Sequence, residues 1–155
     1  MKDLQNAKSV VLFANATIAS DSTTTFRFDT LGFKYSVVDI VQAATATNTT
    51  TKFGVLKITE ADVTSSSSAT AIVALTGTTN TVTDATNGFV INAHTNTTGG
   101  VTKLFINHVG RKRYLFLTIQ GGASHSTITA KAELYQAEQS PDSASERGLT
   151  SQAFA

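Results

Sequence analysis

Cysteine is absent from this 155-residue sequence, and proline and methionine each occur only once. Without cysteine the chain has no disulfide, no thiolate metal ligand and no cysteine nucleophile. Charged residues make up 15% of the chain and its formal net charge is +1, so it lacks the basic excess that non-specific nucleic-acid binding requires. We therefore expect stability from burial and backbone hydrogen bonds, and no nucleic-acid partner.

Long apolar runs are missing too. No stretch approaches the roughly 20 apolar residues that span a bilayer, and the opening Met-Lys-Asp-Leu-Gln-Asn lacks the basic and apolar regions of a secretion signal. We expect an intracellular product without a membrane partner. The length suits one well-buried core.

Several short segments alternate apolar and polar residues, which is the pattern of a strand with one buried face. In 25–29, Phe26 and Phe28 point one way and Arg27 the other. In 128–134, four apolar residues share one face. Further strands are expected at 10–18, 35–41, 53–59, 70–75, 89–93, 103–109 and 114–119.

Tracts rich in Thr, Ser, Asn and Gly separate these segments, and no segment of helical length has apolar residues at three-and-four spacing. The sequence therefore predicts an all-β fold, an antiparallel β-sandwich over 1–137. A jelly roll is favoured by strand count, with an immunoglobulin-like order as the alternative.

Residues 138–155 form a separate C-terminal tail or arm in this interpretation. Ser140, Pro141 and Gly148 could frame about two helical turns. Leu149 and Phe154 are large apolar residues in a polar setting, so the tail is either disordered or an extended arm that docks into a neighbouring subunit.

No catalytic, cofactor-binding or metal-binding residue is expected. The histidines are scattered, at His94, His108 and His125, without the spacing of a metal site, and no Gly-x-Ser-x-Gly elbow occurs. Glu60 and Asp62 could join Asp84 around a cation, but they lack the dense ligand spacing of a calcium loop. We interpret them as solvated turn carboxylates, and the protein as not an enzyme.

The segment 111–119 places three cations, Arg111, Lys112 and Arg113, before a strand that is apolar on both sides. Tyr114 and Phe116 occupy one face and leucines and an isoleucine the other, which indicates a central strand or a face given to a partner. These cations either keep the end of the strand in water and oppose aggregation, or anchor an interface by pairing with carboxylates of a neighbouring loop or subunit. The candidate interface consists of seven residues: Arg111, Lys112, Arg113, Tyr114, Phe116, Leu149 and Phe154.

Four stretches together resemble small virion structural proteins of tailed bacteriophages, marine ones especially: "LQNAKSVVLFANATI", "VLKITEAD", "GRKRYLFLTI" and "AELYQAEQSPDSASERGL". The resemblance implies a β-sandwich that binds the assembled shell as a capsid decoration or cement protein. Its partners would be the major capsid protein and further copies of itself, as a trimer in the first instance and a dimer otherwise.

The expected function is thus stabilisation of the capsid from its outer surface, by a protein made in the host cytoplasm. A tail or fibre module that binds a host glycan through the Thr- and Asn-rich loops is the alternative. A hydrolase is a third hypothesis, and it would require His108 or His125 to meet a carboxylate across strands.

Overall fold

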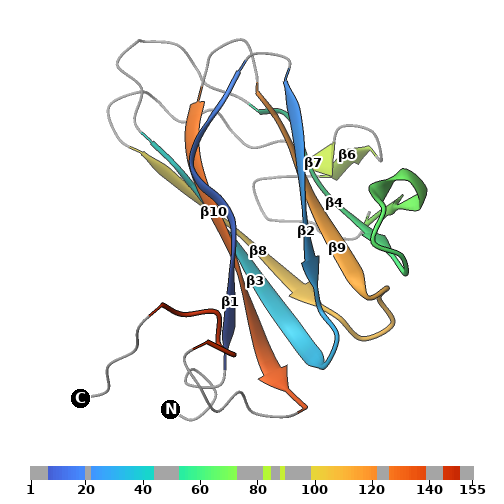
Figure 1. The fold of residues 1–155 in the computed structure, drawn as a ribbon. Coiled ribbons are helices and arrows are strands. Elements are labelled where there is room, and N and C mark those ends of the chain that lie inside the picture. The colour runs from blue at the N-terminus through green and yellow to red at the C-terminus, as the bar shows by residue number, and fades with distance from the viewer. Residues whose placement is uncertain are drawn as a thin grey trace.

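The computed structural model describes residues 7–19, 22–43, 53–72, 82–84, 88–89, 99–121, 126–138 and 145–150. These residues form two β-sheets packed face to face, and none of them lies in an α-helix (Figure 1). The predicted all-β sandwich is confirmed.

The long strands that pair within each sheet are mostly distant in sequence. Sheet A has the order β1 (Lys8–Ile18), β10 (Ser126–Ala137), β3 (Phe33–Gln42) and β8 (Gly100–Asn107). Sheet B has the order β2 (Thr23–Asp29), β9 (Tyr114–Gly121), β4 (Phe53–Ala61), β7 (Gly88–Phe89) and β6 (Val82–Asp84). A 3-10 turn, η1 (Ser66–Ser68), precedes β5 (Thr70–Ala71), which pairs with β4.

Successive long strands alternate between the two sheets. The chain crosses from sheet to sheet at each step from β1 to β4, and again from β8 to β10. All pairings of the long strands are antiparallel. This is the strand order of a jelly roll, in which consecutive long strands lie in opposite sheets.

The core lies between the two sheets and follows the alternation seen in the sequence. On β10 the side chains of Ile128, Ala130, Ala132 and Leu134 are at most 1% exposed. On β9 the inward face is formed by Leu115, Leu117 and Ile119, each 0% exposed. Since β9 lies between β2 and β4, the prediction of a central strand is confirmed.

The two edges of sheet A differ. Two register shifts interrupt the pairing of β1, where Asn15 has a positive φ of 50° and its N–H donates to Thr129 Oγ1 at 3.1 Å. The C-terminal segment, residues 145–150, also runs beside β1 (Figure 1), and the Ser9 N–H donates to the Arg147 carbonyl at 2.7 Å. On the opposite edge, β8 pairs with β3 over eight residues without a shift.

The C-terminal segment contains a turn where about two helical turns were expected. The Gly148 N–H donates to the Ser145 carbonyl at 3.0 Å, and Gly148 has a left-handed φ of 71°. A Cβ at this position would lie 1.9 Å from the Ser9 carbonyl oxygen, so only glycine fits. Ser140 and Pro141, the proposed start of the helix, lie outside the described residues.

Candidate interaction surface

The basic residues before β9 are bound by carboxylates of the same chain. Arg113 and Asp29 form a forked ion pair at the end of sheet B, with Nη2 to Oδ2 at 2.6 Å and Nε to Oδ1 at 3.0 Å. This hydrogen bonding from Arg113 holds the pKa of Asp29 below its usual value, against the opposing effect of burial. The Asp29 Oδ1 also accepts the Leu31 N–H at 3.0 Å, which closes the turn to β3.

Arg111 and Lys112 meet Glu60, which lies near the end of β4. Arg111 Nη1 lies 3.7 Å from Glu60 Oε1, and the Lys112 N–H donates to Glu60 Oε2 at 3.4 Å. Lys112 Nζ donates to Thr70 Oγ1 at 3.4 Å. The nearby Asp62 is exposed, as expected for a solvated turn carboxylate. The same expectation is wrong for Glu60, which lies in β4 with its side chain only 15% exposed. The triplet therefore contacts residues in β2, β4 and β5 of the same chain, a set of partners that its sequence alone could not specify.

Tyr114 and Phe116 share the outward face of β9, but they are placed differently. Arginine guanidinium groups lie over the half-buried Tyr114 ring, Arg113 at 4.8 Å and Arg27 at 5.5 Å from its centroid. Phe116 is 3% exposed, so the single chain does not present its ring to a partner. The interface predicted at these residues stays a prediction.

Of the two tail residues in the candidate interface, Leu149 is half-buried. It follows Gly148, the residue that is packed against Ser9 of β1. Phe154 lies outside the described residues.

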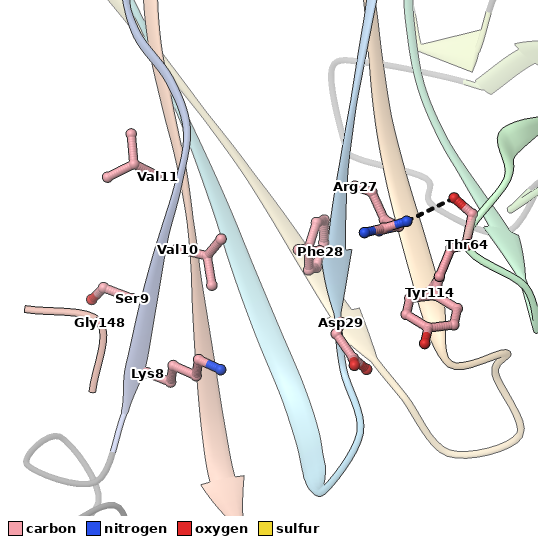
Figure 2. A pocket seen from close by; sticks show the side chains of 10 residues that line it. All are labelled: Lys8, Ser9, Val10, Val11, Arg27, Phe28, Asp29, Thr64, Tyr114 and Gly148. Atoms are coloured by element: carbon pink, nitrogen blue, oxygen red, sulfur yellow. Dashed lines mark hydrogen bonds between the residues drawn. The ribbon is translucent and has the colours of Figure 1, made fainter. Parts of the chain in front are cut away.

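A groove of about 640 Å³ opens between the edges of β1 and β2 (Figure 2). Val10 and Phe28 form part of its apolar lining, and Lys8, Asp29 and Arg27 place charges around it. The hydroxyl residues Ser9 and Thr64 also line it.

His108 is half-buried at the end of β8 and satisfies both ring nitrogens. Its Nδ1 lies 3.0 Å from the Phe33 carbonyl oxygen, which can only accept, so Nδ1 carries a proton. Its Nε2 lies 2.9 Å from Ser36 Oγ and can accept the hydroxyl proton there. Burial lowers the pKa of His108, which favours this neutral form. His108 thus ties β8 to β3; His94 and His125 lie outside the described residues.

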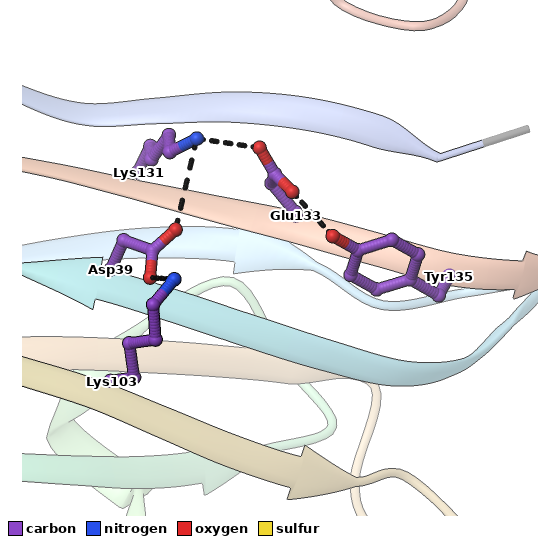
Figure 3. A network of polar contacts seen from close by, with 5 residues as sticks. All are labelled: Asp39, Lys103, Lys131, Glu133 and Tyr135. Carbon is purple, nitrogen blue, oxygen red and sulfur yellow. Dashed lines mark hydrogen bonds and ion pairs between the residues drawn. The ribbon is translucent and has the colours of Figure 1, made fainter. Parts of the chain in front are cut away.

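A charged network crosses the outer face of sheet A (Figure 3). Lys103 Nζ on β8 lies 2.6 Å from Asp39 Oδ1 on β3, and Lys131 Nζ on β10 lies 3.7 Å from Asp39 Oδ2. Lys131 also pairs with Glu133 Oε1 at 2.6 Å, and Tyr135 donates its hydroxyl to Glu133. Two cations and two carboxylates make this network neutral as a whole.

The network alters the acidity of its members. The hydrogen bond to Glu133 raises the pKa of Lys131. Burial would raise the pKa of Glu133, but hydrogen bonds from Lys131 and Tyr135 together lower it. Burial and then the hydrogen bond to Glu133 raise the pKa of Tyr135 to about 12. The protonated Lys131, the ionised Glu133 and the protonated phenol of Tyr135 are therefore the stable forms here.

Exposed apolar side chains flank this network on the same face. Across β3 and β8, Val41 lies opposite Val101 and Val37 opposite Phe105. The large apolar residues exposed on this face are Val11 67%, Tyr35 41%, Val41 44%, Val101 64% and Phe105 67%. Single exposed apolar residues are ordinary, but a group of them on one face is a candidate interaction surface.

The interface predicted from the sequence, at 111–116 and at Leu149 and Phe154, does not include this face. The available signal was that 35–41 and 103–109 carry apolar residues at both odd and even positions. Two apolar faces on two expected strands indicate a surface to be covered on each side of the sheet.

Among the described residues, no three histidine or carboxylate side chains gather as ligands for a metal ion. Nor does this part of the chain contain a helix with the length and apolar character needed to cross a membrane.

No protein-family model matches the sequence. No curated protein matches it at a significant level either. Among solved structures, the chain is similar to one described as "Crystal structure of SPBc2 prophage-derived protein YomS". The TM-score is 0.44 and the identity 17%, over 84% of this chain and 93% of that chain. A likeness this distant carries no argument about function.

Proposed function

We propose that this chain is a structural protein of a phage virion, a decoration or cement protein that binds the outside of the capsid and stabilises it. It would act without catalysis or cofactor, through contacts with the major capsid protein and with copies of itself. The proposal is supported by the four sequence stretches that resemble such proteins and by the outer face of sheet A.

The outer face of sheet A is the observation that carries the proposal. Its apolar side chains offer area whose burial contributes roughly 25 cal/mol per Å². The charges between them are already paired, with Asp39 bound by both Lys103 and Lys131, so covering the face leaves few polar groups unsatisfied. Such a face is suited to adhesion over a broad area.

The test compares Val41→Glu with Val63→Glu on capsids that lack the protein. Val41 is 44% exposed on the outer face of β3, whereas Val63 is 53% exposed on the loop after β4. We expect the first variant to lose shell occupancy and the second to bind like the wild type, as measured by quantitative mass spectrometry. Equal occupancy would reject the face, and only a handful of wild-type copies per virion would reject a shell-wide cement role.

Two exposed aromatic rings support the alternative function, a tail or fibre module that binds a host glycan. Phe105 is 67% exposed and Tyr35 is 41% exposed on the outer face of sheet A, and sugars stack on such rings. A tail or fibre module would therefore bind glycan on this face and not on the loops. Saturable binding to a glycan array, lost in Phe105→Ala, would favour this second function over the capsid role.

A further inference from the structure

We propose that the outer edge of β8 pairs antiparallel with β8 of a second copy, so that two A sheets become one continuous sheet about a two-fold axis at Phe105. This inference goes beyond the proposed function and does not depend on it, because it concerns the chain alone in solution. It predicts a dimer and not the trimer that the sequence resemblance favoured.

The two edges of sheet A are protected to different degrees. Edge strands commonly avoid pairing through bulges, charges or a covering segment. β1 has two register shifts and is bonded at Ser9 by the carbonyl of Arg147. β8 has no register shift, and within the described ranges no strand pairs with it on the side away from β3.

The backbone of β8 points the required groups outward. The His108 N–H donates to the carbonyl of Lys34, its opposite residue, at 2.8 Å. In an antiparallel ladder hydrogen-bonded pairs alternate with non-bonded ones, so the even-numbered residues of β8 bond to β3. The N–H and C=O groups of the odd-numbered residues, Phe105 among them, therefore point toward the outer edge.

Lys103 is the charged residue of β8, and its ammonium group is directed away from the edge. A lysine on an edge strand normally opposes pairing because its ammonium group resists burial against another chain. Lys103 Nζ instead lies 2.6 Å from Asp39 Oδ1, over the face of the sheet. The edge itself keeps the exposed Phe105 and Val101 beside it, at 67% and 64% exposure.

The side chains select one register. With Phe105 opposite Phe105 of the second copy, Lys103 meets Asn107, and Val101 approaches Val109, which is 76% exposed. Centring the axis on Lys103 would place two ammonium groups opposite each other, and a shift between these registers would set Phe105 against Lys103. Aromatic pairs stabilise and like charges destabilise antiparallel pairs, so the axis at Phe105 is favoured. A second copy of the chain supplies this symmetric match.

Because the natural chain has no cysteine, single thiols can report the register. In a hydrogen-bonded antiparallel pair the opposite Cα atoms lie about 5.5 Å apart, within disulfide range. Phe105→Cys should therefore form a covalent dimer under mild oxidation. Lys103→Cys should not, because its two copies would lie about 14 Å apart, four residues along the strand. Val11→Cys on β1 is the second control, with the same 67% exposure as Phe105.

The expected result on non-reducing electrophoresis is a dimer at least roughly tenfold faster for Phe105→Cys than for either control. Equal rates for all three variants, or a faster rate for Val11→Cys, would overturn the proposal. In sedimentation velocity, Phe105→Lys should weaken the dimer roughly tenfold or more, and Val11→Lys should leave it unchanged. A wild-type chain that stays monomeric at the highest concentration tested would also overturn it, whatever its occupancy on capsids.

Discussion

The C-terminal segment is docked on the sandwich and is not a part of its core, so its removal should cost little stability. Ending the chain at Gln139 removes the hydrogen bond from Ser9 N–H to the Arg147 carbonyl and the half-buried Leu149. The bond contributes about 0.5–1.5 kcal/mol and the partial burial about 1 kcal/mol. Freed backbone entropy offsets part of this loss, so we expect a net change below about 2 kcal/mol.

Urea unfolding of the truncated chain would measure this change, with an expected midpoint shift of about 1 M or less. Gly148→Ala is the matched full-length variant, because its Cβ would collide with the Ser9 carbonyl and its φ of 71° would be strained. Both variants should shift the midpoint alike. A loss above about 4 kcal/mol in either would refute the docked-segment reasoning and make the segment integral to the fold. If the tail also binds the shell, the truncated chain should fold yet occupy capsids poorly.

Three further predictions follow from the core and the titrating groups. Leu117→Ala, at a position 0% exposed, should cost about 2–5 kcal/mol in urea unfolding, whereas Val63→Ala, at a position 53% exposed, should be nearly neutral; equal losses would contradict the assigned burial. Burial lowers the pKa of His108, so the unfolded chain binds its proton more readily and stability should fall as pH drops through about 6.5 toward the folded pKa. His108→Gln should flatten that decline, and an unchanged pH profile would assign it to other groups. The pKa of Tyr135 is raised to about 12, so its stabilising effect should be lost as pH rises from about 10 to that value. Ultraviolet titration of the wild type against Tyr135→Phe measures this, and a phenol that ionises near pH 10 would contradict the contact with Glu133.

Local alternation was sufficient to find the long strands and to orient several of them. Phe28 is buried and Arg27 exposed as predicted, and the four inward residues of β10 are all buried. These segments carry polar residues on one face only, so burial of the other face is the one arrangement that leaves charges in water. The 3-10 turn after β4 lies within the Ser-rich tract that was expected to be a loop.

The short elements and the tail were less predictable. Residues 70–75 were expected to be one strand, but β5 spans only Thr70–Ala71 before the described range ends at 72. Of the residues that were expected to form helical turns, the described ones, 145–148, form a turn in which Gly148 packs against the Ser9 carbonyl, a contact made with the other end of the chain. No local pattern encodes a partner more than a hundred residues away.

The sequence by itself determined the all-β class, the positions of the long strands and the absence of thiol chemistry, because these depend on residue identity and on a period of two. The tertiary structure decided which apolar face of β8 is exposed: Leu104 and Ile106 face the core while Phe105 and Val101 face outward. It also decided that Arg113 meets Asp29 and Arg111 meets Glu60. Both outcomes depend on strand register and on loops brought together across the fold, where packing of the whole core selects one of two locally equivalent arrangements.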